Sequence, residues 1–153
     1  MQIEQTAGDD LLTLTGDVVP ADLPALTAAL LAAVEGISAG SDLLVDAHGV
    51  TAFDDAALPA VVAARSRAKW NRMSVAALCD GGSPLEAALR RSGHLGRIGV
   101  HPDAATARRT LAGRRAARAG RLVASGGPAD AAPASVDRGA GPHGTANPYR
   151  VVS

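Results

Sequence analysis

The sequence predicts an α/β protein in which a mixed, mostly parallel sheet is flanked by helices. Short apolar segments compatible with strands alternate with longer segments of helical periodicity, and this alternation is typical of parallel strands joined by crossover helices. The first two strand-like segments are instead separated by a short turn-forming stretch, which indicates an antiparallel opening hairpin. The predicted order of elements is therefore ββαβαβαβα.

The predicted strands are short, apolar and bounded by glycine or polar residues. The hairpin would join the first two through the sequence AGDD at residues 7–10. The third is a compact apolar run between Gly40 and Gly49, which is typical of a buried strand. In chain order, strands are expected at residues 2–6, 11–15, 42–47, 73–79 and 97–102.

The predicted helices begin and end with residues that favour helix termini. Residues 22–36 place Leu23, Leu26, Leu30 and Val34 at intervals of three and four. Residues 54–70 begin with acidic and end with basic side chains, the polarity that a helix dipole favours. Residues 83–93 and 103–119 complete the set, and in the first of these Ser83 is the expected N-cap, Pro84 the first helical residue and Gly93 the C-cap.

Composition indicates one folded domain and a basic tail. The 153 residues are 47% hydrophobic, enough for one core. Residues 1–115 form the predicted domain, and residues 116–153 are a Gly/Pro/Ala-rich segment expected to be disordered. Residues 1–113 carry nine basic and thirteen acidic side chains, a net charge of −4, whereas residues 114–153 carry six and two, a net charge of +4.

The same composition bounds location and partners. No basic-then-apolar leader and no run of roughly 20 apolar residues is present, so we expect a cytoplasmic protein without a transmembrane segment. The tail could contact an anionic surface weakly, but it lacks aromatic residues for stacking on bases apart from Tyr149, and no specific nucleic-acid partner is expected. The single cysteine, Cys79, cannot form an internal disulfide and is expected to be a small buried hydrophobic residue.

Patterns for catalysis or cofactor binding are weak. The GHLGRIG segment at 93–99 ends a helix and leads into a strand, the reverse of a dinucleotide-binding loop. The side chains of Asp46, His48, Asp54 and Asp55 could be imagined as a metal cluster, but a strand end, a turn and a helix start explain them without a metal. His94 and His101 are expected at the surface or in loops, and we expect no cofactor, no metal and no enzymatic activity.

Several motifs follow one another in a defined order between residues 2 and 112. A strand ends in Gly16-Asp17-Val18-Val19, a second reads LLVDAHGVTAF, and the helix start Asp54-Asp55-Ala56-Ala57-Leu58 follows. The segment SPLEAALRRSGHLGRIGVHPDAATA comes later, at 83–107. In this order the motifs resemble the STAS domain, the fold of anti-sigma factor antagonists and related bacterial signalling modules, and the segment at 83–107 is similar to the second half of that family.

The resemblance implies a partner and a contact surface. The partner would be an anti-sigma factor that is also a serine kinase, of the histidine-kinase-like ATPase type, and the chain would regulate a sigma factor by binding it. In regulated members this kinase phosphorylates the first serine after the aspartate and is thereby released. The implied partner-binding residues are Asp17, Val19, Asp54, Asp55, Ala56, Ala57, Leu58, Ser83 and Pro84.

The chain departs from the family at its switch. Asp55 takes the position of the phosphorylated serine and has no hydroxyl, and Val19 stands where many members have a partner-binding aspartate. Asp55 either mimics phosphoserine in part, so that binding is weak, or belongs to a constitutive interface. Asp54 is also expected to act as an N-cap, and Asp55 to interact with the helix dipole.

Two alternatives remain open. A scaffold subunit of a stress-signalling or lipid-transport complex would also fit a STAS domain without its phosphosite. Thr51 and Ser83 are the nearest other hydroxyls for regulation, although a loop position and an N-cap explain them equally well.

Overall fold

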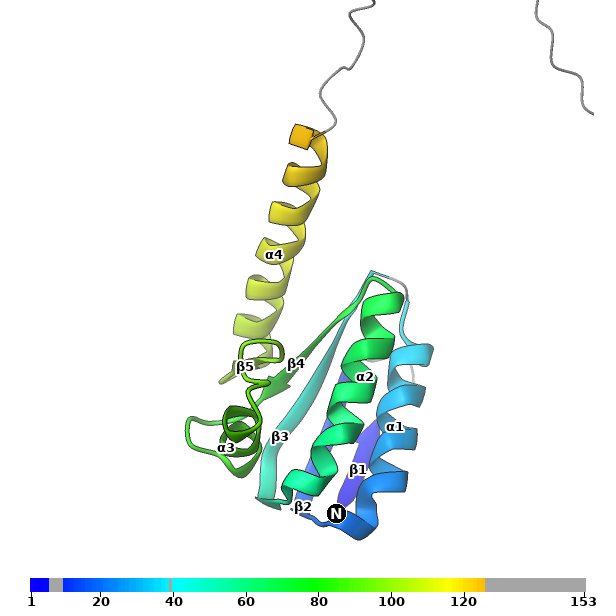
Figure 1. The fold of residues 1–153 in the computed structure, drawn as a ribbon, viewed down its shortest axis with the longest axis vertical. Helices are drawn as coiled ribbons and strands as arrows, with labels where there is room; N and C mark the ends of the chain where they lie inside the picture. The colour runs from blue at the N-terminus through cyan, green and yellow to red at the C-terminus, as the bar shows by residue number, and fades with distance from the viewer. Residues whose placement is uncertain (6–9, 39, 126–153) are drawn as a thin grey trace, which may run out of the picture.

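The computed structural model describes residues 1–5, 10–38 and 40–125. In this part of the chain, five strands form a sheet in the order β1-β2-β3-β4-β5 (Figure 1). The first pair is antiparallel and the other pairs are parallel, as the sequence predicts. The strands are β1 (Gln2–Gln5), β2 (Leu11–Val18), β3 (Asp42–Phe53), β4 (Ser74–Leu78) and β5 (Gly99–His101). The helices are α1 (Leu23–Gly36), α2 (Leu58–Trp70), α3 (Pro84–Arg91) and α4 (Ala104–Ser125), with single 3₁₀ turns η1 (Pro20–Asp22) and η2 (Asp55–Ala57).

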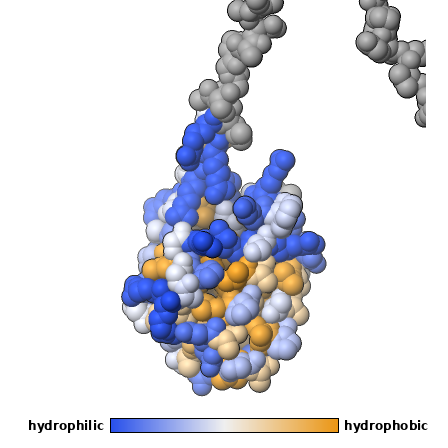
Figure 2. Space-filling model, viewed as in Figure 1, coloured by the Kyte–Doolittle hydropathy of each residue, from blue (hydrophilic) through white to orange (hydrophobic). Residues whose placement is uncertain are grey.

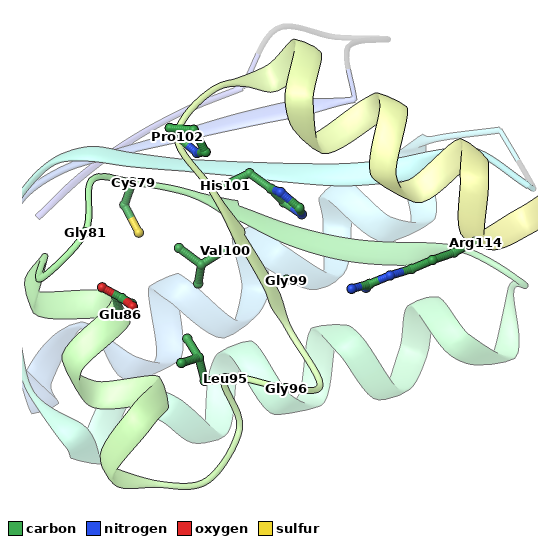
Figure 3. A pocket seen from close by; sticks show the side chains of 10 residues that line it. All are labelled: Cys79, Gly81, Glu86, Leu95, Gly96, Gly99, Val100, His101, Pro102 and Arg114. Atoms are coloured by element: carbon green, nitrogen blue, oxygen red, sulfur yellow. The ribbon is translucent and has the colours of Figure 1, made fainter.

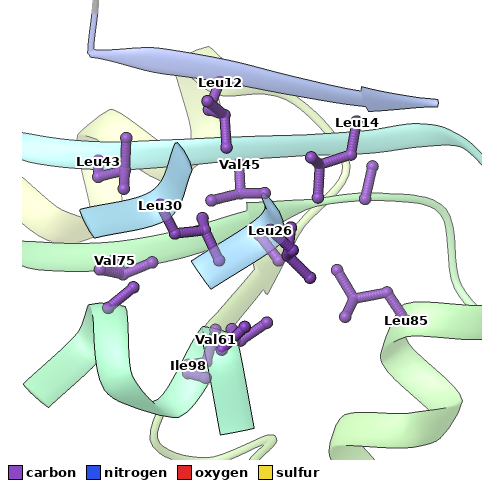
Figure 4. Close-up of a cluster of buried hydrophobic side chains, with 14 of the residues drawn as sticks. Leu12, Leu14, Leu26, Leu30, Leu43, Val45, Val61, Val75, Leu85 and Ile98 are labelled. Carbon is purple, nitrogen blue, oxygen red and sulfur yellow. The ribbon is translucent and has the colours of Figure 1, made fainter. Parts of the chain in front are cut away.

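Helices cover both faces of the sheet. α1, α2 and α3 pack on one face, where leucine, valine and alanine side chains form the larger core (Figure 4). Leu26 and Leu30 of α1 are fully buried there. α4 packs on the other face through Ala107 and Leu111, against Leu44 and neighbouring side chains of β4. The arrangement is the predicted α/β fold.

The third strand is longer than predicted. It was expected to end at residue 47, but β3 continues to Phe53. Its first half pairs with β4, and its second half extends past β4 and pairs with β2 alone. Buried Val50 and Phe53 hold this extension against the core. Asp46 and His48 are therefore strand residues, and their predicted positions at a strand end and in a turn are wrong.

Two glycines shape the pairing of β2 with β3. The register between these strands shifts between Thr13 and Thr15 and again between Gly16 and Asp17. Gly49 lies so close to β2 that a Cβ there would be 2.6 Å from the Thr15 methyl carbon, and Gly16 adopts a φ of +80°. Such bulges increase the local twist and redirect the side chains that follow. Asp17 and Thr51 meet beyond these bulges, where the threonine hydroxyl donates to the carboxylate at 2.5 Å.

The last helix extends beyond the predicted domain boundary. The helix expected at residues 103–119 continues to Ser125, so residues 116–125, which were assigned to the tail, are the final residues of α4. They are rich in arginine and alanine, which have high helix propensity, so the helix continues past its contact with the sheet. Ion pairs of Arg108 with Asp10 and of Arg115 with buried Asp42 attach α4 to the sheet. The predicted hairpin turn and the remainder of the tail fall largely in residues 6–9 and 126–153, outside the described residues.

Candidate protein-interaction site

The ends of β2 and β3 place two turns side by side at one end of the sheet. Because the strands are parallel, Val18 and Phe53 are register partners, and η1 and η2 follow them and contact each other. The Asp54 amide donates to the Val18 carbonyl at 3.0 Å and joins the two turns directly. In Figure 1 this is the lower end of the molecule, where α2 begins.

Asp54 caps the start of this helical segment. Its backbone is extended, and its carboxylate accepts a hydrogen bond from the Ala56 amide at 2.8 Å. The Ala57 amide donates to the Asp54 carbonyl at 2.9 Å. These bonds satisfy amide groups that lack partners at a helix start. The prediction that Asp54 is an N-cap is confirmed.

Asp55 forms an ion pair that the sequence did not suggest. Its two carboxylate oxygens accept hydrogen bonds from Nε and Nη2 of Arg91, at 3.1 and 2.6 Å. Arg91 is in the last turn of α3, 36 positions along the chain, so only the folded structure brings the two together. The guanidinium lowers the pKa of the Asp55 carboxyl, mainly through these hydrogen bonds. Asp55 thus carries a compensated charge, although both side chains are about half exposed.

The neighbouring turn contributes an apolar contact. Val19 is 44% exposed, and among the described residues Trp70 is the other exposed large hydrophobic residue. Its amide donates to the Asp22 carboxylate at 3.0 Å, which fixes the start of η1. Asp17 is exposed on the strand just before it. We use "acidic end" for the surface formed by Asp17, Val19, Asp54, Asp55 and Ala56, with Arg91 beside it.

Other predicted contact residues lie elsewhere. Ala57 is fully buried and Leu58 is 6% exposed, so both side chains pack in the core, and their contact with a partner stays a prediction. They are buried because the helix start turns its apolar side toward the sheet. Ser83 is the N-cap of α3 and accepts from the Glu86 amide at 3.3 Å, as predicted. Ser83 precedes Arg91 by eight positions, about 12 Å along the axis of α3, and contact of Ser83 and Pro84 with a partner stays a prediction.

The imagined metal cluster is not assembled. His48 contacts Asp46 through Nδ1 at 2.7 Å and the Pro102 carbonyl through Nε2 at 3.1 Å. The Asp46 carboxylate raises the pKa of His48, mainly by hydrogen bonding. Asp54 and Asp55 lie six to nine positions further along the chain than His48 and Asp46, about 20–30 Å along an extended chain. Within the described ranges, no group of three potential ligating His, Cys, Asp or Glu side chains is found.

A hollow of about 430 Å³ lies around β5. Figure 3 shows Cys79, Glu86 and Val100 on one side of the strand and His101 with Arg114 on the other (Figure 3). Burial raises the pKa of the Cys79 thiol, whereas burial and the Arg114 charge lower the pKa of His101. Strand β5 therefore separates the thiol of Cys79 from the imidazole of His101. His101 is only 9% exposed, so its expected surface position is wrong, while Cys79 is buried as predicted.

The sheet, its flanking helices and the turn-helix start after β3 define a STAS domain. The chain belongs to this family, since the family model described as "Mlab, STAS domain" matches residues 1–95. A similar solved structure is the crystal structure of an anti-sigma factor antagonist from Mycobacterium paratuberculosis, with a TM-score of 0.55 and 17% sequence identity. The similarity covers 71% of this chain and 90% of that one, and it confirms the fold. No curated protein matches the chain.

Across residues 1–5, 10–38 and 40–125, none of the helices combines the length and the apolar character needed to cross a bilayer.

Proposed function

We propose that this protein is a non-catalytic interaction module that acts as an anti-sigma factor antagonist in the cytoplasm. The acidic end binds an anti-sigma factor of the serine-kinase type and thereby regulates a sigma factor. Membership of the STAS family supports this function, as does the likeness in fold to an anti-sigma factor antagonist. Exposed Val19 and the capped helix start supply an apolar contact and a fixed loop for a partner.

The Asp55–Arg91 ion pair is the observation on which the proposal depends. A free carboxylate at the phosphoserine position would repel the partner in part, as phosphate does. Here two hydrogen bonds from Arg91 compensate the charge. The surface therefore resembles the unphosphorylated, binding-competent state of the family more than the phosphorylated one. Because Asp55 has no hydroxyl, a kinase step at this position cannot end the binding.

Calorimetric titration against the anti-sigma kinase encoded nearest to this protein tests the proposal. The native protein should bind with and without ATP. The Asp55→Ser variant should bind without ATP and be released with ATP, because the kinase can then phosphorylate it. Arg91→Gln should weaken binding at least about tenfold, since it leaves the Asp55 charge uncompensated at the interface.

Arg90→Gln is the matched control for Arg91→Gln. Arg90 is the adjacent residue and also pairs with a carboxylate, but its partner is Glu86. Equal losses in the two variants would show that helix α3, and not the charge of Asp55, controls binding. Binding by Asp55→Ser alone would instead identify Asp55 as a permanent inhibitory charge and contradict constitutive binding.

The absence of a hydroxyl at Asp55 also favours a second function. A scaffold subunit of a stress-signalling or lipid-transport complex needs the STAS fold but no phosphorylation. Its acidic end would then contact a subunit encoded nearby. Complex formation with such a subunit in sedimentation, together with no binding to any anti-sigma kinase of the same genome, would replace the first function with this one.

A further inference from the structure

Basic side chains gather at the opposite end of α2. They come from the last turns of this helix and the residues that follow it, from the segment between α3 and β5, and from α4. Figure 2 shows strongly hydrophilic side chains around the upper part of the molecule, where α2 ends and α4 leaves the sheet (Figure 2). We use "basic end" for Arg65, Lys69, Arg72, Arg97, Arg114 and Arg118.

Among the described residues, these cations have no carboxylate partners. Elsewhere arginines are paired, as Arg67 is with Glu35, Arg91 with Asp55 and Arg115 with Asp42. In the part of the chain that the structure describes, none of the six side chains of the basic end forms an ion pair with a carboxylate. Arg65 instead donates from Nε to the Arg97 carbonyl at 3.0 Å. Six like charges thus lie together, and no carboxylate from residues 1–5, 10–38 or 40–125 is paired with them.

Five of the six surround one cleft. It has a volume of about 210 Å³ and lies between the end of α2, the start of β4 and the side of α4. Apolar side chains contribute to its wall, including those of Met73, Val75 and Leu111. A cleft that has apolar walls and is lined by charges of one sign concentrates the electrostatic field and attracts counter-ions. Arginine binds phosphate oxygens in pairs, and lysine binds them as a point charge.

Trp70 lies beside this cleft. It is 84% exposed, and with Arg65, Lys69 and Arg72 it lines an adjoining hollow of about 490 Å³. An exposed indole ring among cations suits the interfacial layer of a membrane, where the ring is partly inserted and the cations meet phosphates. The Trp70 ring can also pack on an organic group that is attached to a phosphate.

The backbone at Arg72 is a second, independent observation. Arg72 has a φ of +58°, the left-handed conformation, and is the non-glycine residue of the described chain with such a φ. Glycine is favoured at this position after a helix because a side chain is strained there. Residues held in such a conformation often belong to functional sites. Here the strain places an additional cation beside Trp70.

We propose that the cleft at the basic end binds the phosphate group of a ligand, either a lipid head group at an anionic membrane surface or a free phosphate compound. Arg65, Lys69, Arg97, Arg114 and Arg118 bind its oxygens, while Trp70 contacts the attached part of the ligand. This site is on the far end of α2 from the proposed partner surface, so it adds an activity to the interaction module.

Fluorescence of the full chain tests the site directly, because Trp70 is the sole tryptophan. The protein is mixed with phosphatidylglycerol vesicles, with phosphatidylcholine vesicles and with inorganic pyrophosphate, and pyrophosphate binding is also followed by calorimetry. A blue shift with phosphatidylglycerol alone identifies a lipid head group. Saturable binding of pyrophosphate without vesicle binding identifies a free phosphate compound. Either result supports the site, and both should weaken as salt is raised.

Arg118→Gln and Arg109→Gln form a matched pair of variants. Both residues are exposed on α4, but Arg109 lies outside the cleft and donates to Thr106. Arg118→Gln should weaken binding about fivefold, the ratio that corresponds to about 1 kcal/mol for one basic residue at an anionic surface, and Arg109→Gln should have less effect. Equal losses, no binding of either ligand, or binding of an oligonucleotide alone would overturn the proposal.

Discussion

The two ends of α2 differ in whether their charged side chains have partners. At the acidic end, each carboxylate has a structural partner: Asp54 accepts from the Ala56 amide, Asp17 from Thr51, and Asp55 from Arg91. At the basic end, about 20 Å along the helix, the cations lack carboxylate partners among the described residues. The paired carboxylates stabilise a loop conformation, whereas the cations of the basic end remain available for a ligand.

This difference indicates how each end would recognise its partner. The acidic end is already ordered, so a partner meets a fixed surface and little conformational entropy is lost on binding. The basic end carries electrostatic repulsion that an anion would relieve, so its binding should depend strongly on salt. The first end is therefore suited to a specific protein contact, and the second to a class of anionic ligands.

Replacement of Leu30 by alanine tests whether the two ends share one core. This fully buried α1 residue should lose about 2–5 kcal/mol of unfolding free energy on truncation. Urea unfolding followed by Trp70 fluorescence, at the basic end, and by far-UV circular dichroism should then shift to the same lower midpoint. Two separate midpoints would mean that the ends unfold independently and would break the comparison.

Replacement of Asp54 by alanine removes the cap from the acidic end alone. We expect a loss of about 1 kcal/mol, within the range of roughly 0.5–2 kcal/mol found for N-caps, and unchanged pyrophosphate or vesicle binding at the basic end. Asp54→Asn is the control, because asparagine caps a helix nearly as well without a charge. If the asparagine variant is as unstable as the alanine variant, charge and not capping is the stabilising property. Thermal unfolding of the native protein, Asp54→Ala and Asp54→Asn measures the two losses of stability.

Replacement of Arg72 by glycine should separate stability from binding at the basic end. Glycine accepts the left-handed backbone at φ +58° without strain, so unfolding free energy should rise by up to about 1 kcal/mol. Binding of the phosphate ligand should weaken at the same time, since one cation is lost. Urea unfolding and vesicle titration of Arg72→Gly and Arg72→Ala measure the two effects, and the alanine variant loses the cation without relief of the strain. A glycine variant that is less stable than the native protein would show that the Arg72 side chain itself stabilises the fold.

Local features of the sequence predicted most of the fold. Helix starts followed from capping and proline positions, and Ser83 caps α3 as expected. Strand lengths were less predictable, since the extension of β3 depends on pairing with β2 across a bulge. Gly49 looks like a turn residue in the sequence, but in the structure it permits a close approach to Thr15. Tertiary contact thus overrides the local preference.

Prediction of the site was limited by contacts that are distant in the sequence. Asp54 could be identified as a cap because its partner is two residues away. The pairing of Asp55 with Arg91 depends on where α3 ends relative to β3, and the burial of Ala57 and Leu58 depends on the orientation of the helix start. The basic end was also missed because its cations come from three separate segments. Only the sheet brings these segments together.

The smallest expected effect concerns the titration of Asp55. Arg91 holds the pKa of this carboxyl below its ordinary value of 3.8, so the charge remains across the neutral range. Because the folded pKa is the lower one, the ion pair stabilises the protein fully above the unfolded pKa, and this stabilisation is lost as pH falls through the folded pKa. In NMR titrations the carboxyl of Asp55 should therefore titrate below 3.8 in the native protein and move upward in Arg91→Gln. A phosphoserine would instead change charge near pH 6, so partner binding by the native protein should show no step there that depends on Asp55. A step that appears in the native protein and disappears in Asp55→Asn would show that the pair is broken in the complex.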